Sequence, residues 1–188
     1  MEATGFVLAG GESSRMGRDK AFLPYRGTTL LEYIASIVRQ AAGTATILGD
    51  PDRYRDAGYL VCPDQIPWCG PIGGIYTALS VTASDWNLVV ACDMPMLSAP
   101  VLRSLIEHSF QSPSYCVVAT GPDGEPHPLC AVYHRRCLPL LEQAIRDKRF
   151  RMKGLLSEMD AEHVALDATV LANVNTPGEW ARFENRPA

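Results

Sequence analysis

The stretch from Gly5 to Pro24 constrains the fold of this 188-residue chain more than any other part of it. The stretch opens with the apolar run Phe6–Leu8, continues into Ala9-Gly10-Gly11, and shows no further apolar pattern until Ala21. This order predicts a short buried strand that opens abruptly into a long irregular loop. The loop is therefore expected to begin where the first strand ends.

The composition of this loop indicates what it binds. Two adjacent glycines, Gly10 and Gly11, allow backbone N–H groups to approach a ligand with no Cβ in the way, and successive N–H groups turned inward form a site for an anion. Arg15, Arg18 and Lys20 add positive charge to the same loop. Bare amides together with three cations predict a polyphosphate ligand.

Two common phosphate-binding motifs are excluded by spacing. The Walker motif requires a Gly-Lys-Ser/Thr sequence, whereas Gly17 is followed by Arg18-Asp19-Lys20-Ala21. The dinucleotide fingerprint requires Gly-x-Gly-x-x-Gly, and Gly10-Gly11 does not have that spacing. The loop is therefore neither of these two sites.

The loop resembles the L-A-G-G-x-S-x-R-M-G-x-D-K signature of the molybdenum cofactor guanylyltransferases, which are nucleotidyltransferases with a Rossmann-like sheet. The resemblance implies a three-layer α/β/α fold with a mostly parallel sheet, of the nucleotide-diphospho-sugar transferase type. It also implies transfer of GMP from GTP to molybdopterin or molybdenum-molybdopterin, with release of pyrophosphate and use of Mg²⁺. Molybdoenzymes or other cofactor-biosynthesis proteins would be further partners. The alternative is a glycine-rich surface loop with solvated charges.

Length and composition agree with a single nucleotidyltransferase domain over residues 1–188, because a chain of this length buries a sufficient core. A net charge of -4 argues against a surface that binds nucleic acid.

The N-terminus enters a strand directly and no apolar run reaches membrane-spanning length, so we expect a cytoplasmic protein with no membrane partner. The six cysteines show no Cys-x-x-Cys pair and are expected to be reduced, buried apolar residues.

Two aspartates follow predicted strands. Asp64 follows Tyr59–Cys62, and Asp93 follows the almost continuously apolar run Trp86–Ala91, which is typical of a strand buried on both faces. Ligands of open α/β sheets bind outside the carboxyl ends of strands, so Asp93 is expected to face the same crevice as the Gly10 loop. Asp93 is the candidate ligand for Mg²⁺, which takes one or two carboxylates and phosphate oxygens. The alternative for Asp93 is a structural turn before Pro95.

The resemblance extends to the predicted helix start at Gly70-Pro71, where free N–H groups favour an anion. A helix start without a ligand is the alternative. Within the implied site, one set of residues would hold the nucleotide: Leu8, Ala9, Gly10, Gly11, Lys20, Asp64, Gly70 and Asp93. The implied catalytic residues are Arg15, Lys20 and Asp93, of which the two cations neutralise phosphate charge.

Five further residues are candidates for contact with the second substrate. His127 lies in a His-Pro element, and Asn173 and Asn175 lie in an Asn-Val-Asn-Thr-Pro string, both of which resemble the family. Arg149 and Arg151 belong to the one dense basic run. The alternative for His127 is an ordinary loop histidine. The alternative for the basic run is a solvated helix end, where cations are favourable near the helix C-terminus.

Three other functions remain open at this level. A cytidylyltransferase of the same cofactor tends to carry T-A-A-G where this chain has Leu8-Ala9-Gly10-Gly11, which favours GTP over CTP. The other two are a nucleotidyltransferase acting on a sugar phosphate or other small alcohol, and a nucleotide-binding regulator without turnover. One departure from the family pattern is Gly49-Asp50, where the family often has an asparagine that contacts the nucleotide.

Overall fold

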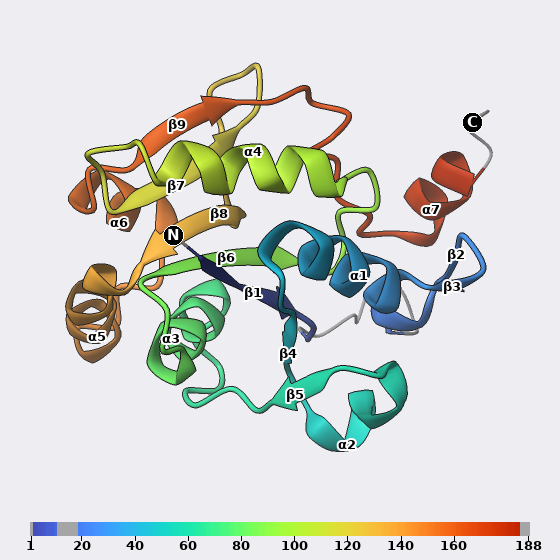
Figure 1. Cartoon of the computed structure of the whole chain (residues 1–188). Helices are drawn as coiled ribbons and strands as arrows, with labels where there is room; N and C mark the ends of the chain where they lie inside the picture. Colours follow the sequence, from blue (N-terminus) through green and yellow to red (C-terminus); the bar gives the residue numbers. More distant parts are fainter. Residues whose placement is uncertain (1, 11–18, 185–188) are drawn as a thin grey trace.

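The computed structural model describes residues 2–10 and 19–184, and its centre is a seven-stranded sheet in the order β5-β4-β1-β6-β8-β7-β9 (Figure 1). Its strands are β1 Ala3–Leu8, β4 Thr46–Leu48, β5 Leu60–Cys62, β6 Trp86–Ala91, β7 Cys116–Thr120, β8 Pro126–His134 and β9 Glu162–Ala165. A separate two-stranded sheet pairs β2 Pro24–Tyr25 with β3 Thr28–Thr29.

Strand direction brings four strand ends to one edge of the large sheet. β1 pairs in parallel with β4 and with β6, and β4 pairs in parallel with β5. β8 runs antiparallel to both β6 and β7, and β9 is parallel to β7. The predicted mostly parallel sheet is confirmed, and the segments that follow β1, β4, β5 and β6 all begin at the same edge.

Helices cover both faces of the sheet, as predicted for three layers (Figure 1). The helices are α1 Leu30–Ala42, α2 Pro51–Tyr54, α3 Pro71–Val81, α4 Ala99–Ser109, α5 Leu138–Arg146, α6 Met152–Glu158 and α7 Pro177–Glu184, with 3-10 turns η1 Lys20–Phe22, η2 Arg55–Ala57 and η3 Arg135–Cys137. Neighbouring residues of β1 point to opposite faces: Val7 packs in the cluster that contains α1 and α4, and Phe6 packs in the cluster that contains α3, α5 and α6. In the part of the chain that the structure describes, no helix is both long enough and apolar enough to cross a membrane.

Local sequence accounts for both ends of α1. The hydroxyl of Thr29 accepts a hydrogen bond from the N–H of Glu32, and the Glu32 carboxylate accepts one from the N–H of Thr29, which forms a capping box. The helix ends at Gly43, whose φ of 79° is the left-handed conformation that glycine adopts without strain. This helix packs on β1 and supports the strand that leads into the first loop.

The basic run, for which the sequence left open a contact with the second substrate or a solvated helix end, leads into a further helix. This helix, α6, begins at Met152 and contributes Met152, Leu155 and Leu156 to the core. Of the six cysteines, all free, Cys92, Cys116, Cys130 and Cys137 are buried as predicted, whereas Cys62 and Cys69 are partly exposed.

Candidate functional site

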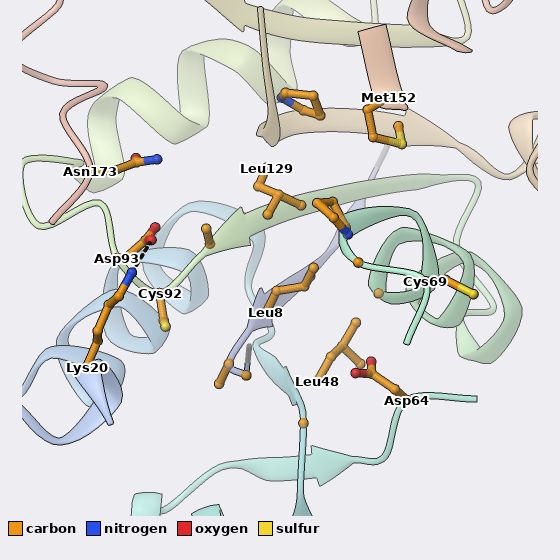
Figure 2. Close-up of a pocket in the computed structure, with 18 of the residues that line it drawn as sticks. Leu8, Lys20, Leu48, Asp64, Cys69, Cys92, Asp93, Leu129, Met152 and Asn173 are labelled. Atoms are coloured by element: carbon orange, nitrogen blue, oxygen red, sulfur yellow. Dashed lines mark hydrogen bonds and ion pairs between the residues drawn. The ribbon is translucent and has the colours of Figure 1, made fainter. Parts of the chain in front are cut away.

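A pocket of about 1010 Å³ lies at the carboxyl edge of the sheet. Its walls come from the residues after β1, β4, β5 and β6, from the start of α3, and from β8 and the start of α6. Figure 2 shows Leu8 and Leu48 between two polar groups, with Lys20 and Asp93 on one side and Asp64 on the other. This is the crevice in which open α/β sheets bind ligands.

Lys20 connects three distant parts of the chain. Its Nζ lies 3.3 Å from Asp93 Oδ2 and donates a 2.7 Å hydrogen bond to Asn175 Oδ1. Lys20 begins η1 after the first loop, Asp93 follows β6, and Asn175 precedes α7. Two of the residues that the sequence assigns to catalysis thus meet in one contact, together with a residue that it assigns to the second substrate.

The segment that carries Asn175 is fixed against Asp93 by the backbone. The N–H of Val174 donates to the Asp93 carbonyl at 2.9 Å. On the other side of Asn175, the hydroxyl of Thr176 accepts from the N–H of Glu179 at 3.2 Å, and the Glu179 carboxylate accepts from the N–H groups of Asn175 and Thr176. These bonds hold Asn175 beside Lys20.

One oxygen of Asp93 has no hydrogen-bond partner among the residues that the structure describes. Among the described residues, Asp93 Oδ1 is buried and accepts no hydrogen bond. A buried carboxylate oxygen without a donor is unfavourable, because desolvation is not offset. The same oxygen has the chemistry of a hard ligand for a divalent cation.

Asp19, immediately before Lys20, forms a network of hydrogen bonds and an ion pair that was not predicted from the sequence. Its Oδ2 accepts a 2.8 Å hydrogen bond from the Tyr54 hydroxyl and lies 2.7 Å from Arg53 Nε, and its Oδ1 accepts from the N–H of Ala21 at 3.0 Å. Burial and the Asp19 hydrogen bond raise the pKa of Tyr54 far above its usual value, so the hydroxyl stays a donor. The network fixes the chain just before Lys20. In the sequence, the position of Asp19 directly before Lys20 was the feature that could have indicated this role.

The strand ends are close together because of a glycine. A Cβ at Gly49 would lie 2.2 Å from the Ala9 carbonyl oxygen and 2.8 Å from the Tyr54 ring. By contrast, Gly10 has a φ of 141°, and no atom of the described residues lies within 4 Å of the position that a Cβ would take. Gly10 therefore leaves the backbone accessible in the pocket, and Gly49 allows β4 and Tyr54 to approach the first loop.

The predicted nucleotide-binding residues within the described ranges all line this pocket: Leu8, Ala9, Gly10, Lys20, Asp64, Gly70 and Asp93. Gly11 and Arg15 lie outside the described residues. Partial burial raises the pKa of Asp64 above its ordinary value. Gly70 precedes α3 with a φ of 66°. Because it has no side chain, it does not cap the first N–H groups of that helix.

The second-substrate candidates are divided by the fold. His127 and Asn173 line the pocket. Arg149 forms ion pairs with Asp147 and Glu158, and neither Arg149 nor the exposed Arg151 belongs to the pocket wall. Their apolar neighbours Phe150 and Met152 line it instead. The basic run therefore contributes apolar side chains, and not its arginines, to the pocket wall.

The fold and the site define an α/β nucleotidyltransferase class, in which a nucleotide lies across the carboxyl ends of parallel strands. Residues 5–164 match the family described as the MobA-like NTP transferase domain, and the chain belongs to this family. The resemblance predicted from the first loop is thereby confirmed.

Similar proteins agree with this assignment. A "probable molybdenum cofactor guanylyltransferase" from Trichormus variabilis is 35% identical over 187 residues, covering 95% of this chain and 88% of the relative. The crystal structure of molybdopterin-guanine dinucleotide biosynthesis protein A from Archaeoglobus fulgidus has a TM-score of 0.77 at 22% identity, covering 95% of both chains. A Mycobacterium tuberculosis protein solved in complex with manganese has a TM-score of 0.71 at 22% identity, covering 99% of this chain and all of its own.

Proposed function

We propose that this protein transfers GMP from GTP to molybdopterin, or to molybdenum-molybdopterin, and releases pyrophosphate. The observation that carries the proposal is the 3.3 Å contact of Lys20 with Asp93 at the carboxyl edge of the sheet. Family membership supplies the reaction class, and the name of the Trichormus relative supports the substrates. The pocket volume of about 1010 Å³ is at the upper end of the range for single small-molecule sites, which suits a nucleotide together with part of an acceptor.

Asp93 is the residue that would hold a divalent cation, which we propose to be Mg²⁺. Within residues 2–10 and 19–184, no cluster of three or more His, Cys, Asp or Glu side chains is arranged for a metal. This fits Mg²⁺, which binds through one or two carboxylates and completes its octahedron with water and substrate phosphates. The unpartnered Asp93 Oδ1 is the available ligand atom. Bound there, the ion would neutralise charge on the phosphate oxygens.

The chain's own residues would position the substrates and balance charge. The acceptor is a phosphate monoester, whose second pKa of about 6 makes it an anion at neutral pH, so it needs no general base. It would attack the α-phosphorus in line, the bond to the bridging oxygen would break, and pyrophosphate would leave. Lys20 would turn from Asp93 to the phosphates, while the backbone of Leu8 to Gly10 and the side chain of Asp64 hold the nucleotide.

The acceptor would lie on the β8 side of the pocket. His127 and Asn173 line that part of the site, and Asn175 is already bonded to Lys20. Arg151 would act from outside the wall, as a charge that attracts an anionic substrate, whereas the charge of Arg149 is balanced by Asp147 and Glu158. We further propose that the reaction takes place in the cytoplasm, where molybdoenzymes or other cofactor-biosynthesis proteins would receive the product.

A pyrophosphate-release assay tests the function directly. The protein is incubated with Mg²⁺ and each of ATP, CTP, GTP and UTP, with and without molybdopterin. We expect release only with GTP and molybdopterin together. Preference for CTP would assign the cytidylyltransferase instead, release with a sugar phosphate would assign another acceptor, and binding without release would assign a regulator.

Tyr54→Phe tests whether the Asp19 network positions Lys20. The change keeps the buried ring and removes one hydrogen bond to a carboxylate, which costs about 1.5–3 kcal/mol of stability. For a chain of this size we expect the Tm to fall by roughly 3–12 °C, together with a several-fold weaker affinity for GTP. Thermal melts and calorimetric GTP titration measure both quantities.

Tyr33→Phe is the matched control for this experiment. Its hydroxyl donates a 3.2 Å hydrogen bond to the Leu97 carbonyl, and Tyr33 does not line the pocket around Lys20. This control is expected to lower the Tm without changing GTP affinity. If Tyr54→Phe behaves in the same way, the network has only a structural role.

A further inference from the structure

Trp68 is exposed to an extent that is unusual for tryptophan. The residue is 90% exposed, whereas the other two tryptophans, Trp86 and Trp180, are 9% and 3% exposed. A tryptophan side chain has a large apolar surface that is normally covered for the most part. Because Trp68 also lines the pocket, its exposed ring is available at the wall of the candidate site.

The backbone holds Trp68 in a defined position. Its φ of 69° lies in the left-handed region, which a bulky residue seldom adopts. Before Trp68, the N–H of Gln65 donates to the Thr77 hydroxyl of α3 at 3.0 Å; after Trp68, the chain enters α3 at its N-cap Gly70, whose carbonyl accepts from the N–H of Gly73 at 3.1 Å. The strained residue therefore belongs to an anchored loop, and strain of this kind concentrates at ligand sites.

Trp68 lies at the end of the pocket that is remote from Lys20 and Asp93. Figure 2 shows Cys69 and Asp64 on the side opposite Lys20 and Asp93, with Leu8 and Leu129 between them. Trp68 directly precedes Cys69, and Ile66 and Pro71 make the neighbouring wall apolar. A ligand with its phosphates at Lys20 would extend its other end toward this apolar region.

We propose that Trp68 stacks on a fused heteroaromatic ring of the substrate and holds that ring at the end of the pocket remote from Lys20. The inference rests on the proposed function, because guanine and pterin are both flat, nitrogen-containing bicyclic rings. An indole face binds any such ring by stacking, without reading its hydrogen-bonding groups. Trp68 thus selects for a ring of this class at that position.

Tryptophan fluorescence tests the contact without relying on turnover. Since Trp86 and Trp180 are buried, a ligand that enters the pocket should change mainly the emission of Trp68. The probes are GTP, guanosine, 6-hydroxymethylpterin and inorganic triphosphate. We expect the ring-bearing probes to quench emission and inorganic triphosphate to bind without quenching. Quenching by guanosine alone assigns the ring to the nucleotide, and quenching by the pterin alone assigns it to the acceptor.

Substitutions separate stacking from a general effect on the loop. Trp68→Ala is expected to weaken GTP or pterin binding by about 5- to 100-fold, the range for loss of one stacking partner, and to leave triphosphate affinity unchanged. Trp68→Phe should recover most of the affinity and abolish the quenching. The control Leu60→Ala removes another exposed apolar group, 71% exposed and outside the pocket wall, and should change neither. Equal loss for triphosphate and ring-bearing probes, or no loss, overturns the proposal.

The same preparations distinguish failure of this inference from failure of the proposed function. If the wild type releases pyrophosphate while Trp68→Ala retains both KM values, stacking is wrong and the function stands. If guanosine or the pterin quenches Trp68 emission while no nucleotide yields pyrophosphate, the function is wrong and the stacking contact stands.

Discussion

Lys20→Ala is expected to lower the single-turnover rate of GMP transfer by about 10²–10³-fold, the loss typical of one preorganised charge-stabilising donor. This corresponds to roughly 2.7–4 kcal/mol in the barrier. Lys20 is the described cation that touches Asp93, so its removal also leaves Asp93 Oδ2 without that partner beside an anionic substrate. Rapid-quench measurement of product with GTP and molybdopterin gives the rate.

The fold should survive this substitution. The Lys20 and Asp93 side chains are only 18% and 19% exposed, so loss of this hydrogen bond between charged groups costs about 1.5–3 kcal/mol, and the Tm should fall by roughly 3–12 °C. Arg55→Ala is the matched control, since it removes one positive charge from an exposed pair with Asp52 outside the pocket wall. A folded Lys20→Ala protein with a near-normal single-turnover rate would remove Lys20 from the mechanism.

Asp93→Asn is expected to reduce Mg²⁺-dependent turnover by at least about 10²-fold, because Asp93 would hold the ion, and an ion that neutralises phosphate charge contributes several kcal/mol. The substitution keeps the size of the side chain and loses its charge. GTP affinity in the absence of metal should fall only modestly, because Lys20 and the backbone of the first loop remain. Turnover and GTP binding are measured across a Mg²⁺ titration.

Stability measurements on the same variant separate a metal ligand from a structural turn. In the metal-free protein the Tm of Asp93→Asn should change little, because loss of the ion pair is offset by removal of a buried charge whose Oδ1 accepts no hydrogen bond from a described residue, and because Lys20 keeps its bond to Asn175. Asp85→Asn is the control, because it makes the same charge change next to the opposite end of β6. A destabilised Asp93→Asn enzyme with full activity per folded molecule would overturn the metal assignment.

Much of the fold could be predicted because its signals are local. The apolar run of β1, the capping residue Thr29 of α1 and the fully buried β6 are each readable from fewer than fifteen neighbouring residues. Parallel strands then force their carboxyl ends to one edge of the sheet, which is why Asp93 could be expected in the same crevice as the first loop.

The contacts within the site could not be predicted in the same way. Lys20 is 73 residues from Asp93 and 155 from Asn175, and no spacing rule joins residues so far apart. Asp19, Tyr54 and Arg53 were not assigned at all, because a carboxylate in a loop and a tyrosine in a short helix have many possible partners. Only the approach of β4 to the first loop, permitted by Gly49, brings them together.

The sequence by itself determined the family, the layered α/β fold and the strand ends that carry the site, because these depend on local motifs and on apolar periodicity. Tertiary structure alone decided which side chains face the pocket. Arg149 and Arg151 stand outside the wall, while Phe150 and Met152 line it and Trp68 remains exposed at it. The reason is the docking of α6 against the core and the anchoring of one loop on α3, which orient neighbouring residues in opposite directions.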